Sequence, residues 1–136
     1  MSKEREKEIL RLLLAKKKIT VNELSNLLFT SESSIRRDLA RLENQQLVKR
    51  IHGGAIIEEN SISTLKIPFV MRELEQSDAK IKIAKQAIEY INDYDVIFLD
   101  ASSSAYSLVP FLAVKNHLTV ITSGTKTLVK LGEYGI

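Results

Sequence analysis

Cysteine is absent from this sequence of 136 residues, and long apolar runs are absent as well. Without cysteine, disulfides and thiolate metal sites are excluded. No stretch reaches the roughly 20 apolar residues that a membrane-spanning helix needs. The amino terminus, MSKEREKEILRLLLAKKK, is charged within its first residues, which is unlike a signal peptide. These absences predict a cytoplasmic, soluble chain.

Positive charge is concentrated in the first part of the chain. Residues 1–56 contain 12 Lys/Arg and 7 Asp/Glu, whereas residues 57–136 contain 8 Lys/Arg and 10 Asp/Glu. A basic module followed by a mildly acidic one is the pattern expected when only the first module meets a polyanion.

The stretch from Thr30 to Ala55 predicts a helix followed by a hairpin. Ser31 is placed to cap the helix. One apolar stripe runs along it, formed by Ile35, Leu39 and Leu42. The opposite face carries Ser33, Ser34, Arg37 and Arg41, with Arg36 on its flank. Arginine pairs with phosphate or guanine and serine allows close approach, so this face suits a DNA major groove. A plain solvent-exposed helix face is the alternative.

Two helices precede this one. The first is expected over residues 3–15. The second is expected over residues 21–28, with Val21, Leu24, Leu27 and Leu28 facing inward. Thr20 and Glu23 have the spacing of a capping box at its start. Two short helices joined by a tight turn are typical of a helix-turn-helix.

The period changes after residue 46. Residues 47–51 predict a strand, residues 52–54 (His-Gly-Gly) a turn, and residues 55–57 the return strand. This hairpin is interpreted as a wing. Lys49, Arg50 and His52 are expected along a duplex backbone or at its minor groove, and Gly53 lets the turn approach the duplex closely.

Residues 33–55, SSIRRDLARLENQQLVKRIHGGA, resemble the DeoR-type family of bacterial transcriptional repressors of sugar metabolism. The matched positions are Ile35, Arg36, Arg37, Asp38, Leu39, Leu42, Glu43, His52, Gly53, Gly54 and Ala55. Gln46 departs from the family's usual glycine, so it is expected in a left-handed conformation or at a differently ended helix. The Ser33-Ser34 pair stands where a Glu-Thr type pair is common. The resemblance implies a winged helix-turn-helix repressor that binds double-stranded operator DNA.

Asp38 lies on a helix that is expected to face DNA. Because phosphates repel a carboxylate, Asp38 is interpreted as structural, pairing with Arg41 or another arginine of the same helix.

The remaining sequence predicts a linker and a second domain. The expected domains are a winged helix-turn-helix (1–57), a linker (58–75) with a short helical lead-in at 69–75, and a partial effector-binding domain (76–136). The second domain is expected to contain a helix (80–92, with Ile83, Ala84, Ala87, Ile88 and Ile91 inward), a buried parallel strand (96–99), a helix (104–114), a strand (118–121) and a helix from about residue 126. The overall class is α/β. Because two strands cannot cover both faces, this domain is expected to be incomplete, and family members are normally longer.

Polar residues follow both predicted strands, where parallel sheets bind their ligands. The candidate effector residues are Asp100, Ser102, Ser103, Ser104, Thr122, Ser123 and Lys126. Serine hydroxyls at a helix amino terminus can cradle a phosphate, while Asp100 could hold a sugar hydroxyl and Lys126 could add charge. The segment is similar to the family's sensor domain, which implies a phosphorylated sugar effector and a homo-oligomer at full length. Two departures are Ser102, at a position often glycine, and Gly124, which follows Thr122-Ser123 in place of the order Thr-Asn-Ser. Helix capping alone is the alternative role for the serines.

Two other functions remain open. A sugar-phosphate isomerase-like enzyme could use Asp100 as acid or base, but no paired carboxylate, positioned histidine or lysine base accompanies it, and His117 lies away from the crevice. The winged helix could instead be a protein-interaction module. The preferred interpretation has no catalytic residue, no metal and no cofactor.

Overall fold

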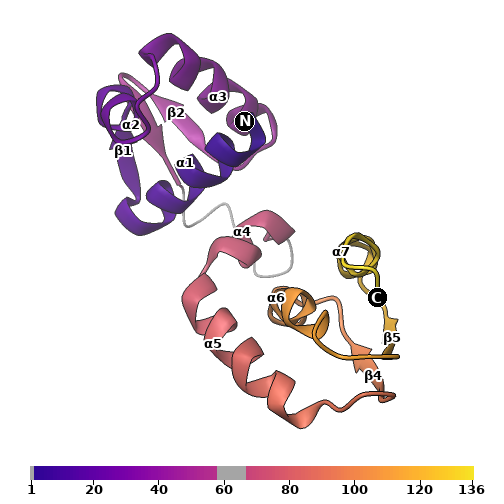
Figure 1. The fold of residues 1–136 in the computed structure, drawn as a ribbon. Coiled ribbons are helices and arrows are strands. Elements are labelled where there is room, and N and C mark those ends of the chain that lie inside the picture. Colours follow the sequence, from indigo (N-terminus) through magenta and orange to yellow (C-terminus); the bar gives the residue numbers. More distant parts are fainter. Residues whose placement is uncertain (1, 58–66) are drawn as a thin grey trace. The chain divides into compact units, whose positions relative to one another are not determined.

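The computed structural model describes residues 2–57 and 67–136. The chain forms two compact units, Met1–Glu75 and Gln76–Ile136 (Figure 1). The first is a winged helix-turn-helix and the second a small parallel α/β unit, which confirms the predicted fold class. Within the described ranges, no helix has the length and apolar character needed to cross a bilayer.

The first unit combines helices with a small antiparallel sheet. Its helices are α1 (Ser2–Lys16), α2 (Val21–Leu27), α3 (Glu32–Asn44) and α4 (Phe69–Leu74), and its strands are β1 (Lys18–Thr20), β2 (Lys49–Ile51) and β3 (Gly54–Ile56). The strand order is β1-β3-β2 with antiparallel pairing throughout. β2 and β3 form the predicted wing, and β1 extends its sheet.

Local sequence signals set the helix ends. The Thr20 hydroxyl accepts a hydrogen bond from the Glu23 amide, and the Glu23 carboxylate accepts one from the Thr20 amide, so the capping box is confirmed. Ser31 caps α3 by accepting from the Ser34 amide. Gln46 has φ 58°, which confirms the left-handed conformation.

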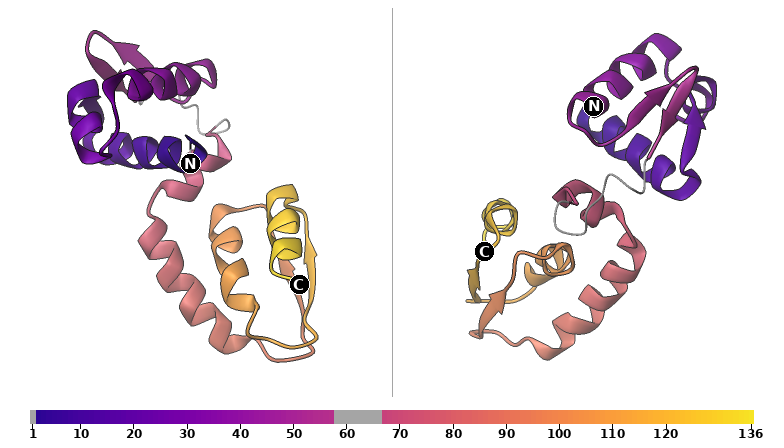
Figure 2. Two further views of the ribbon diagram at one scale, coloured as in Figure 1. Left: turned by 45° about the horizontal axis from the view of Figure 1, so that its top comes forward. Right: turned by 180° about the vertical axis from the view of Figure 1, so that it is seen from behind.

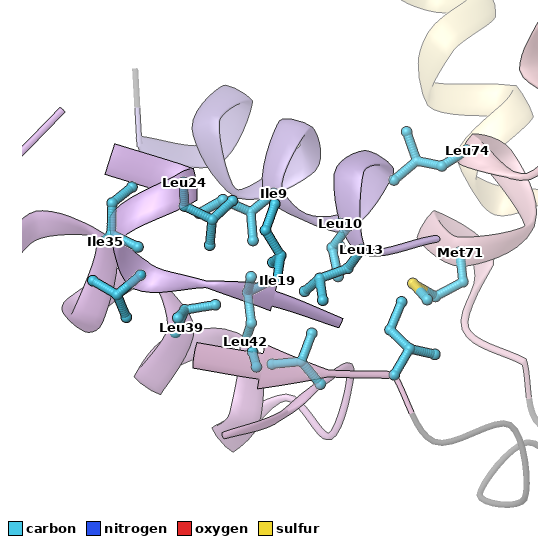
Figure 3. Packing of buried hydrophobic residues seen from close by; sticks show 14 residues of the cluster. Ile9, Leu10, Leu13, Ile19, Leu24, Ile35, Leu39, Leu42, Met71 and Leu74 are labelled. Carbon is cyan, nitrogen blue, oxygen red and sulfur yellow. The ribbon is translucent and has the colours of Figure 1, made fainter. Parts of the chain in front are cut away.

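One apolar cluster holds the first unit together. The stripe of Ile35, Leu39 and Leu42 is buried against residues of α1 and α2, as predicted. Figure 3 shows these side chains meeting, with Met71 and Leu74 of α4 at one end of the cluster. Within the predicted linker 58–75, residues 58–66 lie outside the described residues. Residues 69–74 form the expected helix, and this helix belongs to the core.

Leu27 was predicted to face inward, but the structure leaves it 48% exposed. At about 100° per residue, Leu27 lies well away from Val21 around the helix. The buried face of α2 is therefore narrower than its row of leucines suggests.

The second unit places its helices on one side of a two-stranded sheet (Figures 1 and 2). It comprises α5 (Ser77–Ala87), a 3₁₀ turn η2 (Ile88–Tyr90), β4 (Val96–Leu99), α6 (Ser103–Leu112), β5 (Thr119–Thr122) and α7 (Thr125–Glu133). β4 and β5 pair in parallel, with Leu99 opposite Thr122. α6 packs against both α5 and α7. The prediction of a parallel strand-helix-strand pattern is confirmed.

Two details of the second unit were predicted wrongly. β4 was expected to be buried, but Val96 and Phe98 are 66% and 64% exposed. The reason is that helices cover one face of the sheet only, and alternate residues of a strand point to opposite faces. Ile83 was expected on the inner face of its helix, yet it is 58% exposed. α5 packs along a narrow seam centred on the buried Ala84.

Candidate functional site

The exposed face of α3 carries the candidate DNA contacts. Ser33, Arg36 and Arg37 are exposed, and Ser34 is half-buried. Arg36 is paired with Glu32, with 2.6 Å between its Nη2 and Oε2 of the carboxylate. Arg37 donates to the Ser34 hydroxyl at 3.2 Å. Within residues 2–57 and 67–136, no carboxylate pairs with Arg37. Its guanidinium is therefore available to a phosphate or a guanine edge.

Arg41 lies on the same helix but is held by two carboxylates. Its Nε donates to Glu6 Oε1 at 2.7 Å, and its Nη2 donates to Asp38. Asp38 is fully buried. The structure thus fixes the direction of Arg41, whose side chain remains 46% exposed.

Asp38 also pairs with Arg5 of α1. Arg5 donates from Nε and Nη2 to the two carboxylate oxygens of Asp38, the second at 3.2 Å. These hydrogen bonds, and then the charge of Asp38, raise the pKa of Arg5. The predicted partner Arg41 is confirmed. Arg5 was missed because 33 residues separate it from Asp38, and no local pattern connects them. The carboxylate therefore joins α3 to α1.

The wing is attached to the end of α3. Glu43 accepts a hydrogen bond from the Arg50 amide at 2.9 Å and another from Arg50 Nε at 2.7 Å. These hydrogen bonds hold the pKa of Glu43 below its ordinary value, and the bond from the Arg50 amide has the larger effect. Arg50 is consequently fixed beside the carboxyl-terminal turn of α3. This contact attaches the wing to the carboxyl-terminal end of the helix that carries the candidate arginines.

The wing turn is set by two glycines. Gly53 has φ +75°, a conformation that favours glycine, and its carbonyl accepts from the Val21 amide at 2.8 Å. A Cβ on Gly54 would lie 2.3 Å from the Ile19 carbonyl oxygen, because β1 passes directly beside it. Lys49 and His52 are exposed on this hairpin. The turn can therefore approach a duplex while its base stays tied to β1 and α2.

The second candidate site lies where β4 and β5 end. Since Leu99 and Thr122 are paired, the loops after them run side by side, and a Cβ on Gly124 would lie 3.1 Å from the Ala101 Cα. The structure therefore brings together the loop that carries Asp100 and Ser102 with the loop that carries Ser123.

Several candidate groups in these two loops already have local hydrogen bonds. The Ser102 hydroxyl caps α6 by accepting from the Ala105 amide at 3.1 Å. The Thr122 hydroxyl accepts from the Gly124 amide at 3.0 Å. The hydrogen bond from the Ser102 hydroxyl, and after it the one from the Ser102 amide, lower the pKa of Asp100. Ser103 is buried, whereas Ser104, Ser123 and Lys126 are exposed. The carboxylate and the exposed groups are the ones that a ligand could reach.

Thr127 was not among the predicted residues. It is 1% exposed, and its Oγ1 has no hydrogen-bond partner in the described part of the chain. It lies beneath Gly124, whose added Cβ would come within 2.9 Å of that oxygen. The spacing of Thr127 and Leu131 on α7 signals an inward face, but it gives no sign of an unpaired hydroxyl.

Comparison with known proteins shows two matched domains. The DeoR-like helix-turn-helix domain matches residues 5–61, and the DeoR C terminal sensor domain matches residues 75–135. No solved structure matches the chain.

Curated relatives carry regulator names. The chain is 40% identical to the HTH-type transcriptional regulator GolR of Listeria innocua, over 96% of this chain and 50% of that protein. It is 32% identical to the HTH-type transcriptional repressor CsqR of Escherichia coli, over 90% of this chain and 46% of that protein. It is 28% identical to the glycerol-3-phosphate regulon repressor of Escherichia coli, over 88% of this chain and 46% of that protein. The chain spans about half the length of these relatives. All three are named as transcriptional regulators or repressors.

Proposed function

This chain belongs to the DeoR family of transcriptional regulators, and we propose that it is a sequence-specific DNA-binding repressor of a sugar-metabolism operon. The observation that carries the proposal is the Glu43–Arg50 contact, which holds the arginine-bearing helix and the wing as one surface. The relatives are bacterial proteins, so the proposed place of action is the cytoplasm, with the DNA.

In the proposed complex α3 enters the major groove. Ser33, Ser34 and Arg37 meet base edges near the beginning of the helix, as in other helix-turn-helix proteins. The backbone contacts are assigned to Arg36, Lys49, Arg50 and His52, with Gly53 at the tip of the wing. Arg41 is assigned to a phosphate next to α3, because Asp38 and Glu6 fix its direction and a guanidinium has several donors.

The proposed effector is a phosphorylated sugar bound at the loops that follow β4 and β5. Asp100 would accept hydrogen bonds from sugar hydroxyls, since an ionised carboxylate has acceptors only. The phosphate is assigned to the exposed Ser104, Ser123 and Lys126, beside the amino termini of α6 and α7. Ser102 and Thr122 shape the two loops through their local hydrogen bonds, and Ser103 is buried beneath them. One relative is named for a glycerol-3-phosphate regulon, which is consistent with a phosphorylated ligand.

We further propose that the full-length protein is a homo-oligomer. A dimer fixes the distance between two recognition helices and therefore the spacing of two half-sites. A ligand that alters this spacing changes operator affinity.

Fluorescence anisotropy tests the DNA proposal. The chain is titrated with duplex from upstream of its own gene and with random duplex, over a series of salt concentrations. The expected result is tighter binding to the upstream duplex, with log K falling steeply against log salt. Equal binding to both duplexes at every salt concentration would contradict a sequence-reading repressor. Salt-insensitive behaviour would favour the protein-interaction module.

Calorimetry with a panel of sugar phosphates tests the effector proposal. One member should bind, and Asp100→Asn should weaken it at least tenfold, while Asp78→Asn on the exposed part of α5 should not. Inorganic phosphate and the free sugar are run beside it to separate the two halves of the ligand. Turnover of a sugar phosphate by the purified chain would instead support an isomerase-like enzyme.

A further inference from the structure

Phe29 is an aromatic residue that the first unit leaves almost entirely in water. It lies in the turn between α2 and α3, and it is 96% exposed. Its φ is +48°, a left-handed conformation that is a genuine outlier for a bulky residue. Both features oppose folding, because glycine or asparagine would fit this turn without strain and without exposing a ring.

The turn is held firmly in this conformation. The Thr30 amide donates to the Ser25 carbonyl at 3.1 Å, and the Ser25 hydroxyl donates to the Thr30 carbonyl at 2.7 Å. The Thr30 hydroxyl donates to the Leu28 carbonyl at 2.9 Å. These bonds lie on both sides of Phe29 and fix its backbone. The ring is therefore presented to solvent from a rigid turn.

The position of this turn in a helix-turn-helix places the Phe29 ring beside the DNA. Phe29 precedes the N-cap Ser31 by two residues, so their Cα atoms are within about 8 Å. In helix-turn-helix complexes the first helix crosses the DNA backbone and the beginning of the second enters the major groove. The turn between α2 and α3 then lies against the wall of the groove, close to Ser33 and Ser34.

A duplex offers apolar surface at that place from two sources, the thymine 5-methyl group and the deoxyribose. Phenylalanine is one of the side chains that pack on the thymine methyl. We propose that Phe29 is a DNA-contacting residue whose ring packs on this apolar surface, next to the polar contacts of α3. This inference rests on the proposed DNA-binding function and adds a contact to it.

The test compares Phe29→Gly with the wild-type chain. The DNA is a duplex that the wild-type chain has selected from a randomised pool, together with an unselected duplex. Glycine removes both the ring and the strain, so the melting temperature should stay equal or rise. Affinity for the selected duplex should fall on the order of tenfold, the loss expected when one base contact is removed. Leu27→Ala, at a half-exposed apolar residue two positions away, is the matched control and should bind as the wild type.

Replacing dT by dU one position at a time separates the two sources. If the ring meets a thymine methyl, one replacement weakens the wild-type chain and has no effect on Phe29→Gly. If it meets deoxyribose, dU has no effect, and Phe29→Gly loses affinity for both duplexes alike. Either result supports the contact.

Two results would overturn it. Phe29→Gly could bind both duplexes as tightly as the wild-type chain, which removes the inference and leaves the proposed function standing. Alternatively, its loss of affinity could accompany a smaller sedimentation coefficient, which assigns Phe29 to a contact between two copies of the chain. A wild-type chain that selects no duplex from the pool contradicts the proposed function, and the inference with it.

Discussion

Glu43 and Arg50 are joined by two hydrogen bonds, from the Arg50 amide at 2.9 Å and from its Nε at 2.7 Å. Glu43 is in the last turn of α3, and Arg50 is the middle residue of β2. Arg50 is opposite Ala55 in the wing hairpin, yet its amide is satisfied by a side chain of α3. The orientation of the wing is therefore set by the recognition helix.

Glu43→Ala should release this attachment. We expect the Arg50 amide to exchange its hydrogen much faster in the variant, because its acceptor has been removed. DNA affinity should fall several-fold for all sequences, since we propose that the wing contacts the DNA backbone. Amide exchange by NMR and anisotropy with two duplexes measure both effects. Glu32→Ala, which removes the exposed partner of Arg36, is the control and should leave the Arg50 amide protected.

The same contact predicts a pH dependence. The hydrogen bonds from Arg50 lower the pKa of Glu43 in the folded chain. The stabilisation from this contact is therefore complete above the pKa of glutamate in the unfolded chain, about 4.3. It is lost as the pH falls through the folded pKa. The difference in melting temperature between wild type and Glu43→Gln should therefore be largest near pH 7 and should shrink below about pH 4.3. A constant difference from pH 7 to pH 3 would contradict the ion pair.

Asp38→Ala should destabilise the first unit strongly. Removing one partner of a buried ion pair leaves its cations uncompensated, and such changes cost about 3–5 kcal/mol. The value here should lie near the lower end, about 3 kcal/mol, because Arg5 and Arg41 are 27% and 46% exposed. Urea unfolding measures the change. Glu32→Ala breaks an exposed pair on the same helix and should cost less than about 0.5 kcal/mol; equal losses would contradict the structural role of Asp38.

Gln46→Gly should stabilise the chain. Gln46 has φ 58°, and the amides of Gln46 and Leu47 donate to the carbonyls of Glu43 and Leu42 at 2.8 and 3.0 Å. This is the hydrogen-bond pattern that glycine usually completes at a helix end. Relief of the left-handed strain, less the greater entropy of unfolded glycine, should give about 0.5–1 kcal/mol. Gln45→Gly, at the preceding residue with negative φ, should destabilise; a loss of stability in both variants would contradict the account.

Local features of the fold were predictable from the sequence because their partners lie within one helical turn. The Thr20–Glu23 capping box and the Ser31 cap each depend on residues three positions apart. The left-handed conformation of Gln46 was expected instead from the glycine that is usual at this position in the family. The buried stripe of α3 follows from the helical period alone. The two adjacent loops after β4 and β5 follow from the rule that the carboxyl ends of parallel strands lie at one edge of the sheet.

The remaining features depend on neighbours that are distant in sequence. The Arg5–Asp38 pair joins α1 to α3, and Glu43 accepts hydrogen bonds from Arg50 of β2, beyond the turn that ends α3. The sequence shows that the residues of β4 are all apolar. It does not show that the helices pack on only one face of the sheet and leave Val96 and Phe98 on the other face exposed. The exposure of Phe29 depends likewise on how α2 and α3 meet.

Thr127→Val should stabilise the second unit. The Thr127 hydroxyl is buried and unpaired in the described part of the chain, and leaving such a group unsatisfied costs about 1–3 kcal/mol. Valine has the same shape, so replacing the hydroxyl by a methyl should recover roughly 1 kcal/mol. Thermal unfolding of the chain measures this gain. A clear loss of stability would mean that the hydroxyl has a partner, and Thr125→Val at the exposed start of α7 is the control.

The most direct measurement is the affinity of Arg37→Ala for a duplex selected by the wild-type chain and for random duplex. Arg37 has no carboxylate partner among the described residues, so we assign it to base reading. Its loss should cost about 1–3 kcal/mol on the selected duplex and much less on the random one. Lys85→Ala removes one positive charge from the exposed side of α5 and should change neither value. Equal losses on both duplexes would contradict sequence reading by α3.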